Sequence, residues 1–569
     1  MLYFSGKLKN SLAIGLIVLT TACGFLNKGK RVGSASNIVP PVEGPSNLMP
    51  QSGMTVAVHP FQLADKGPNV HIAWAPFQEP PIWQGLHVVP GFHWEWIPPA
   101  VTQLQWKKDS SESWVDAPTL SRDEKIPADV HYLRYYTELK SNFVSRNWPA
   151  VLGFADATAL STGIPSFLHL LPADLAETVQ IIFYKNNTEL LQNIIGEAEK
   201  CGTGCVTFSQ YAAALDAPFT VFKDDPNAEN FFGKDQKLQL IMSARASETI
   251  PALNNEKVAK AFSKVNEIFR HLSNSWGDFA QNKNYTFHLL QSDGCRYQGL
   301  EHHYGSLLSL GTSCEKELHY ANFLKLASHE LVHAWNAKRV FALEAGIYTP
   351  LKFSKDRLKS LYLYEGMTEG FSRIALGQFE SDLLPYKVRL DKWNESSLNI
   401  RQASSSATIE SVSQESPSIG YEVGALLTLR LASLLNAEFG EAEAKSRFWQ
   451  FMVHLAQPKN KNTFDVLLPS WTHFVFNQST ASMNNAAAQG YSRSDIESAF
   501  SETLGSQKFE VLKSEFFSDS PLFLNKDNWN GIVKEIAQIC SLNTIFLQDS
   551  LMVFDTRSDF IGDKKCWFL

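Results

Sequence analysis

The sequence predicts an α+β multidomain protein in which a β-rich region comes first, followed by a mixed region and then a helical one. Short runs of β-branched and aromatic residues, broken by proline and glycine, extend from about residue 56 to residue 247. From about residue 248 onward, apolar residues recur at helical spacing. The length of 569 residues, of which 44% are hydrophobic, suffices for two or three domains with substantial cores.

The first residues have the three parts of an export signal. Lys7 and Lys9 precede an apolar stretch from Leu12 to Leu19, and small residues follow up to Cys23. This stretch is too short to cross about 30 Å of hydrocarbon. The segment resembles the bacterial lipobox, although Thr20 stands where the lipobox prefers leucine. The alternative is an ordinary secretory signal.

The lipobox resemblance implies a signal peptide over residues 1–22 and lipidation of Cys23, which would become the first residue of the mature chain. The protein would then be anchored to a membrane of the bacterial cell envelope. Gly24 is not the aspartate associated with retention in the inner membrane, so the outer membrane or its periplasmic side is the default address. Residues 23–55, which contain Pro40, Pro41, Pro45 and Pro50, are expected to form a flexible tether.

Residues 56–247 are predicted to form an amino-terminal β-sandwich domain, with strands near Val70–Ala73, Val179–Tyr184 and Lys237–Met242. This region is rich in tryptophan, at positions 74, 83, 94, 96, 106 and 114. Such residues form a sugar-binding surface in some proteins, but large aromatic side chains more often lie in the core, and we expect a core here.

The cysteines also indicate export. Apart from Cys23, six remain, and they form near pairs in the sequence: Cys201 with Cys205, Cys295 with Cys314, and Cys540 with Cys566. Disulfides at these pairs are typical of proteins in oxidising compartments. Free buried thiols are the alternative.

The helical pattern begins with Asn255–Ser273, and a strand is expected at Tyr285–Leu290. Further helices are expected around His329, around Glu365 and at Ala425–Leu435. Residues 248–500 are therefore assigned to a second domain, and residues 501–569 form a carboxyl-terminal extension that the sequence leaves unclassified. A net charge of −7 gives no reason to expect a nucleic-acid partner.

One helix carries the pattern HELVH, from His329 to His333. Positions four apart project from one helix face, so both imidazoles can reach a single zinc ion. Three protein ligands leave a fourth position for water, whose pKa zinc lowers toward about 7, and Glu330 is placed to act as the general base. The alternative is coincidence on an ordinary amphipathic helix.

Glu365 is the better candidate for the third ligand, because a glutamate among leucine and tyrosine is costly to bury without a cation. Glu369, one turn later, is a candidate to orient a ligand histidine through the other ring nitrogen. Alternatively, both carboxylates lie on a solvated helix face.

Four blocks resemble the glycyl aminopeptidase family, thermolysin-like zinc peptidases of the gluzincin type. Residues 329–339 read HELVHAWNAKR, and residues 364–371 read YEGMTEGF. Residues 298–302 resemble the family's Gly-Gly-Leu-Glu-His strand, and residues 420–426 its Tyr-Asp-Lys-Gly-Ala-Leu segment. The long gap between His333 and Glu365 favours this family over enzymes like aminopeptidase N. Gln298 and Val423 depart from its pattern.

The resemblance implies an amino-terminal β domain and a thermolysin-like catalytic domain with a helical second lobe. It implies that Glu301 binds the free α-amine of a substrate, whose backbone pairs with the same strand. Tyr421 would donate a hydrogen bond to the developing oxyanion. Without the resemblance, Glu301 is equally a surface carboxylate and Tyr421 a core tyrosine. His302 and His303 are not assigned as ligands, because neighbours on a strand point to opposite faces.

Together these observations predict a lipid-anchored zinc aminopeptidase that removes small residues such as glycine from peptides. His329, His333 and Glu365 would bind one zinc ion. Two alternatives remain: an endopeptidase of the same fold, and a catalytically silent peptide-binding lipoprotein that keeps zinc for structure.

Overall fold

The structure is a computed structural model of the 569-residue chain. It describes residues 53–59, 69–75, 81–83, 101–120, 124–137, 154–155, 159–163, 168–171, 177–185, 188–189, 192–194, 199–202, 204–208, 211, 214, 217–222, 230–232, 238–242, 255–276, 285–292, 297–302, 305–311, 316–336, 361–379, 408–415, 417–456, 493–518, 521–522, 525–540, 544–546 and 552–554. All of them belong to one compact unit, residues 43–569. The predicted signal peptide, Cys23 and most of the predicted tether lie outside the described residues, so the lipid anchor stays a prediction.

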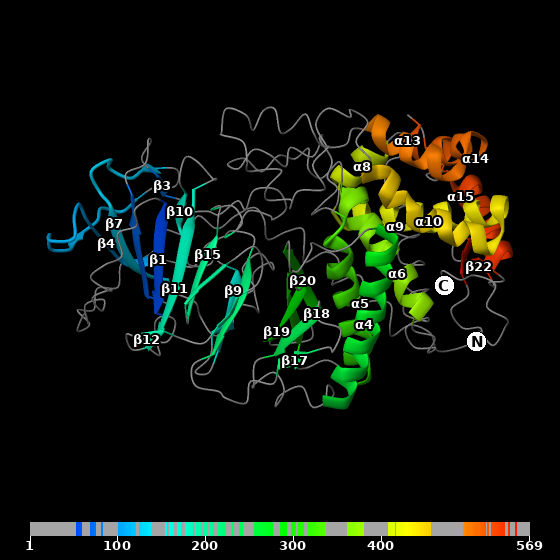
Figure 1. Ribbon diagram of the computed structural model, residues 1–569. Coiled ribbons are helices and arrows are strands. Elements are labelled where there is room, and N and C mark those ends of the chain that lie inside the picture. The colour runs from blue at the N-terminus through cyan, green and yellow to red at the C-terminus, as the bar shows by residue number, and fades with distance from the viewer. Residues whose placement is uncertain are drawn as a thin grey trace, which may run out of the picture. The chain divides into compact units, whose positions relative to one another are not determined.

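A nine-stranded sheet dominates the amino-terminal region (Figure 1). At its centre, β1 (Met54–His59) pairs antiparallel with β2 (Asn69–Trp74) and parallel with β11 (Val179–Lys185). The predicted strands near residues 70 and 179 are thus confirmed. The remaining strands are β7 (Tyr132–Thr137), β4 (Val101–Lys107) and β5 (Val115–Asp116) on one side, and β15 (Cys205–Phe208), β14 (Glu199–Gly202) and β12 (Thr188–Glu189) on the other. Every residue of β1, β2 and β7 is buried, so both faces of the central sheet are covered.

Two smaller sheets belong to the same region. One comprises β10 (Leu170–Leu171), β3 (Ile82–Trp83) and β6 (Glu124–Lys125); the other comprises β13 (Gln192–Ile194), β16 (Pro218–Phe222), β9 (Ala159–Gly163) and β8 (Phe154–Ala155). Trp74 and Trp83 are 1% and 5% exposed, which agrees with a core role. Cys201 and Cys205 are joined by a disulfide. The other two expected pairs each have a member outside the described residues.

A five-stranded sheet follows, in the order β17 (Asn230–Phe232), β18 (Leu238–Met242), β19 (Tyr285–Ser292), β21 (Gly305–Gly311) and β20 (Tyr297–His302). β18, β19 and β21 run parallel, and β20 is antiparallel at the edge. β17 and β18 precede residue 248, where we expected the second domain to begin, yet β18 pairs with β19, which lies beyond it. The predicted helix is α4 (Asn255–Trp276), which contacts β18 and α5 (Lys316–His333).

Helices dominate the rest of the described chain. They are the π-helix η6 (Tyr362–Met367), α6 (Thr368–Phe379), α8 (Ile409–Glu415), α9 (Pro417–Phe439), α10 (Glu441–Ala456), α13 (Arg493–Leu504), α14 (Ser506–Leu512), the π-helix η9 (Lys513–Phe517) and α15 (Lys526–Cys540), followed by the hairpin β22 (Thr544–Phe546) and β23 (Met552–Phe554). In α9, every residue from 423 to 435 is buried, so this helix is central to the region.

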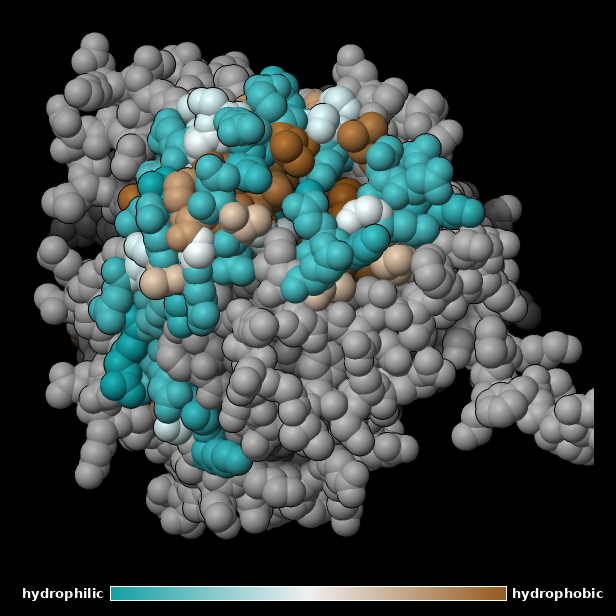
Figure 2. Space-filling view, turned by 90° about the vertical axis from the view of Figure 1, so that its right-hand side faces the viewer, coloured by the Kyte–Doolittle hydropathy of each residue, from teal (hydrophilic) through white to brown (hydrophobic). Residues whose placement is uncertain are grey.

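The extension from residue 501, unclassified by sequence, thus consists of helices followed by the hairpin of β22 and β23 where it is described. Figure 2 views the side on which α13, α14 and α15 lie, and its described surface is mostly hydrophilic with small groups of hydrophobic residues between. Among the described residues, no helix is long and apolar enough to cross a membrane.

Candidate metal centre

The two histidines of the HELVH pattern lie near the end of α5. Leu324, Ala327 and Leu331 are fully buried in the core, which fixes the rotation of the helix. The helix is also tied to the sheet, because the Tyr285 hydroxyl of β19 donates a hydrogen bond to the Glu330 carbonyl at 2.9 Å. As the spacing of four predicts, the imidazole rings of His329 and His333 lie together, with centroids 4.8 Å apart.

Glu365 lies in the π-helical turn η6, which leads directly into α6. Asn336, just after α5, holds this turn: its Nδ2 donates to the Leu363 carbonyl at 3.0 Å and to Thr368 Oγ1 at 2.8 Å. On the other side, α9 approaches closely, since a Cβ atom on Gly424 would lie 1.8 Å from the Tyr362 carbonyl oxygen. The turn that carries Glu365 is therefore held between two helices.

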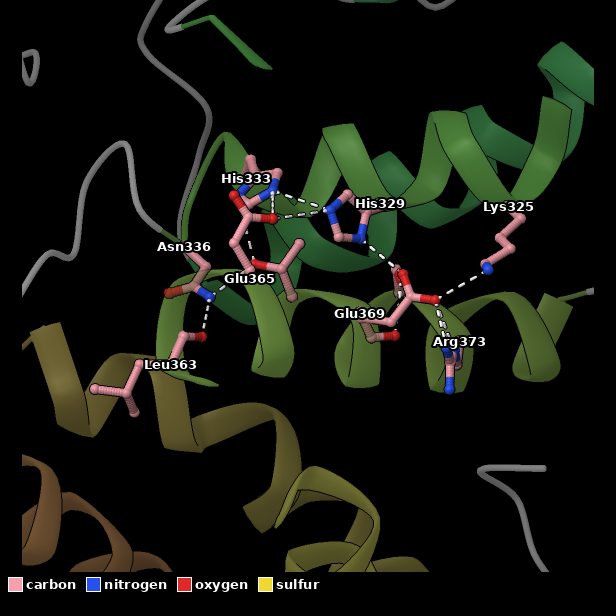
Figure 3. A network of polar contacts seen from close by, with 10 residues as sticks. Lys325, His329, His333, Asn336, Leu363, Glu365, Glu369 and Arg373 are labelled. Atoms are coloured by element: carbon pink, nitrogen blue, oxygen red, sulfur yellow. Dashed lines mark hydrogen bonds and ion pairs between the residues drawn. The ribbon is translucent and has the colours of Figure 1, made fainter. Parts of the chain in front are cut away.

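Three ligand atoms meet between these elements (Figure 3). His329 Nε2 and His333 Nε2 are 3.1 Å apart, and they lie 3.4 and 3.3 Å from Glu365 Oε2. All three residues are buried. A histidine and carboxylate set at these separations can bind a metal ion, and it comprises the three residues that the sequence suggested.

The carboxylates determine the charge of this cluster. Burial by itself would lower the pKa of His329, but hydrogen bonds to Glu365 and Glu369 outweigh it and raise the pKa to about 10. The pKa of His333 is also raised, because attraction to Glu365 exceeds the effect of burial. Conversely, burial disfavours the charged Glu365, yet the two histidines hold its pKa well below the usual range. The site therefore favours positive charge beside Glu365.

Glu369 lies one turn after Glu365 and accepts a hydrogen bond from His329 Nδ1 at 2.8 Å. This is the orienting contact that the sequence suggested for it. Arg373 and Lys325 contact the other carboxylate oxygen. These cations and His329 outweigh burial and hold the pKa of Glu369 well below its usual range.

Glu330 and Glu301 lie on the sheet side of the cluster. Carboxylate oxygens of both lie within 4.8 Å of a ring nitrogen of His333 and of each other. Gly299 makes room for Glu330, because a Cβ atom at Gly299 would lie 2.1 Å from Glu330 Oε1. Gly299 and Glu301 share one face of β20, and His302 lies on the opposite face, so it stays outside the cluster. Burial, with repulsion from Glu301 and Glu365, raises the pKa of Glu330 to about 8 against the pull of the histidines.

Tyr421, in the first half of α9, completes the group. Its ring stacks on His329 at a centroid distance of 6.1 Å. Burial, together with the charge of Glu365 and a hydrogen bond to it, raises the pKa of Tyr421 well above its usual value. The phenol is therefore protonated and able to donate a hydrogen bond within the site.

All seven residues that the sequence singled out for this site, Glu369 included, thus lie together in one cluster. Sequence reasoning missed Lys325, Arg373, Asn336 and Gly424. A signal existed for the first two, because Lys325 precedes His329 by four residues and Arg373 follows Glu369 by four. Asn336 and Gly424 act through tertiary contacts that leave no local pattern.

Comparison with known proteins gives a family match over the segment that contains most of this site. Residues 322–425 match the model of the M61 glycyl aminopeptidase family, which confirms the resemblance over the segment that contains His329, His333, Glu365 and Tyr421. Comparison with curated proteins found no match.

A solved structure shares the fold. An aminopeptidase N family protein from Idiomarina loihiensis superposes with a TM-score of 0.51 at 18% identity, covering 77% of this chain and 76% of that chain. An M1 zinc metallopeptidase from Deinococcus radiodurans gives a TM-score of 0.40 at 14% identity, covering 81% and 93%. The first likeness supports a mixed α/β fold with sheet and helical regions, as predicted, while the predicted β-sandwich and lobe boundaries stay predictions.

Proposed function

We propose that this chain, which the family match identifies as a hydrolase of peptide bonds, is a zinc aminopeptidase that releases small residues such as glycine from peptide amino termini. The observation that carries the proposal is the triangle of His329 Nε2, His333 Nε2 and Glu365 Oε2. Its sides are 3.1, 3.4 and 3.3 Å. Ligands at about 2.0–2.1 Å from a tetrahedral zinc ion are separated by about 3.3 Å, so the donor set fits zinc in both chemistry and spacing.

Each neighbouring residue then has a role. Zinc, when bound by His329, His333 and Glu365, would supply Lewis acidity for activating water and polarising a carbonyl. Glu330 would take the proton of the attacking water, and its pKa of about 8 lies in the range that suits a general base. Tyr421, protonated and beside Glu365, would donate a hydrogen bond to the developing oxyanion.

Glu301 would bind the α-amine of the substrate, which favours removal of single residues from the amino terminus. Glu301 is 7% exposed, and its carboxylate lies beside Glu330 and His333, where an ammonium group would gain a charged partner. β20 is the last strand in the order of the five-stranded sheet, so an extended substrate would add to this edge.

Export and lipid anchoring belong to the same proposal. They are supported by the lipobox-like segment that ends at Cys23 and by the disulfide between Cys201 and Cys205, a bond typical of oxidising compartments. In a bacterial host, wild-type protein should incorporate labelled fatty acid and fractionate with envelope membranes, and Cys23→Ala should do neither. Equal labelling of both would count against the anchor.

The central test replaces Glu330 by Gln. Zinc content should stay near one ion per chain, because Glu330 is not among the proposed ligands, while peptide turnover should fall by several orders of magnitude. Glu443→Gln, which changes an exposed carboxylate of α10, is the matched control. Unchanged turnover in Glu330→Gln would remove this residue as the base, and zinc-loaded wild-type protein without turnover would favour the silent peptide-binding lipoprotein.

A second test separates aminopeptidase from endopeptidase action. Wild-type enzyme should cleave free-amine peptides far faster than the same peptides with a blocked amine. Glu301→Gln should lower kcat/KM for free-amine peptides about 10–100-fold, the worth of a hydrogen bond to a charged group, and leave blocked peptides unaffected. Equal cleavage of both substrates by wild-type enzyme would establish the endopeptidase alternative.

A further inference from the structure

Two helical segments of the metal centre carry polar residues at matching intervals of four. They are Lys325, His329 and His333 in α5, and Glu365, Glu369 and Arg373 in η6 and α6. This spacing places each set on one helix face. α5 packs against α6, and the two sets face each other (Figure 3).

Glu369 joins the two sets through both of its carboxylate oxygens. Oε2 accepts a hydrogen bond from His329 Nδ1 at 2.8 Å. Oε1 contacts Arg373, from Nε at 2.8 Å and Nη2 at 2.6 Å, and Lys325 Nζ at 3.1 Å. Because an ionised carboxylate only accepts, Nδ1 carries a proton, which leaves Nε2, the nitrogen that faces His333 and Glu365, as the one that could bind a metal ion.

The two ligand histidines are oriented by different means. His333 Nδ1 lies 3.5 Å from the Thr368 hydroxyl, which itself accepts a hydrogen bond from Asn336 at 2.8 Å. That arrangement is neutral, whereas His329 faces a carboxylate with two cations behind it. The side chain of Glu369 is only 9% exposed. A buried carboxylate that loses its cationic partners is strongly disfavoured, so it would shift away from His329.

We propose that Lys325 and Arg373 are positioning residues for the metal ligand His329 and act through Glu369. This inference rests on the proposed zinc function. The two cations fix the rotation of the Glu369 carboxylate, and Glu369 in turn fixes the tautomer and ring orientation of His329. Loss of such an outer partner lowers metal affinity about 10–100-fold, and a loss of this size is expected for Arg373→Met and Lys325→Met.

The test measures the zinc dissociation constant of the full-length protein by competition with a chromogenic chelator at fixed pH. Arg447→Met is the control for Arg373→Met, because Arg447 contacts Glu443 at the same spacing of four and the same Nε–Oε1 distance of 2.8 Å. Lys264→Met, which breaks a contact with Glu267, is the control for Lys325→Met. The controls should bind zinc like the wild type, and thermal unfolding of the metal-free proteins reports any general damage.

A double-mutant cycle separates positioning from a merely structural role. Glu369→Gln should weaken zinc binding, and adding Arg373→Met to it should cause little further loss, because Arg373 would act on the zinc site through Glu369. Additive losses, or wild-type affinity in both single cation variants, would overturn the inference. If Arg373→Met does not fold, Lys325→Met decides, because the Lys325 side chain is 30% exposed. Arg373→Lys, which keeps a positive charge, should then retain part of the wild-type zinc affinity.

The same measurements distinguish this inference from the proposed function. Wild-type protein that binds no zinc, or binds it without hydrolysing peptides, contradicts the proposed function and removes the basis of the inference. Wild-type protein that binds zinc and hydrolyses peptides, with unchanged zinc affinity in Lys325→Met and Arg373→Met, contradicts the inference alone.

Discussion

Buried histidines occur both in the sheets of this protein and in its metal centre, and the two groups differ in what surrounds them. His59 of β1 stacks on Tyr184, and His288 of β19 contacts the Thr220 hydroxyl at 2.8 Å. Burial lowers the pKa of His59 to about 4 and, with repulsion from His302, that of His288 to about 3. His329 and His333 are as deeply buried, yet their pKa values are raised.

This difference shows what the glutamates add. When an aromatic ring or a hydroxyl lies beside a buried histidine, desolvation determines the pKa of the histidine, and the imidazole stays neutral. Glu365 and Glu369 reverse that outcome. Glu369 has Lys325 and Arg373 as balancing cations, whereas Glu365 is buried beside the two histidines and is costly without a positive charge next to it. A divalent cation supplies such a charge, so the comparison distinguishes a site for an ion from an ordinary core.

Replacing Glu365 by Gln should have the largest effect on this comparison. The substitution removes the negative charge nearest both histidines and one of the three proposed ligands. Loss of an outer partner alone costs about 10–100-fold in metal affinity, so loss of a ligand should cost more than about 100-fold. Chelator competition measures the effect, with Glu443→Gln as the control. Zinc binding at wild-type strength would mean that Glu365 is not a ligand.

The comparison also requires that Glu365 stay within reach of both histidines, which depends on the contact between α9 and η6. A Cβ atom on Gly424 would lie 1.8 Å from the Tyr362 carbonyl oxygen, so Gly424→Ala must displace either α9 or η6. We expect a loss of about 1–3 kcal/mol in the free energy of unfolding and weaker zinc binding.

Urea unfolding and chelator competition measure both effects of Gly424→Ala. Gly531→Ala, in α15, is the matched control, because a Cβ atom there meets nothing within 4 Å. Alanine should stabilise that helix by about 0.5–1 kcal/mol. Equal stability of the two variants would show that the approach of α9 does not constrain the site.

Much of the metal centre could be predicted because its residues belong to short local patterns. The spacing of His329 and His333 follows from helix geometry, and Glu365 and Glu369 stand out as acidic residues in an apolar segment. The π-helical form of η6 was not predictable, since its wider turn is held by Asn336 and approached by Gly424, which are distant in sequence.

The fold was less predictable than the metal centre, because much of it depends on contacts between residues far apart in the sequence. Individual strands such as β2, β11 and β19 follow from their composition, but the partner of a strand is chosen by contacts far along the chain. β18 was therefore expected within the amino-terminal domain, although it pairs with β19. The helices after residue 500 pack through long-range contacts, such as that of Arg430 with Glu515, which no local spacing reveals.

The smallest expected effect concerns the buried histidines of the sheets and tests the lowered pKa of His59. His59 has a lowered pKa in the folded protein, so the unfolded chain binds the proton more readily between about pH 6.5 and pH 4. Its contribution to stability is complete above pH 6.5 and is lost as the pH falls toward 4. From pH 7 to pH 5 this single residue should account for about 1–2 kcal/mol of lost stability.

Phenylalanine keeps the aromatic contact with Tyr184 and cannot be protonated. Urea unfolding of metal-free wild-type protein and His59→Phe at pH 7 and pH 5 isolates this residue, because every other titrating group is common to both. The variant should lose less stability on acidification. If both proteins lose the same amount, His59 is protonated at no cost in the folded state, and the contrast with the metal centre then rests on His288 alone.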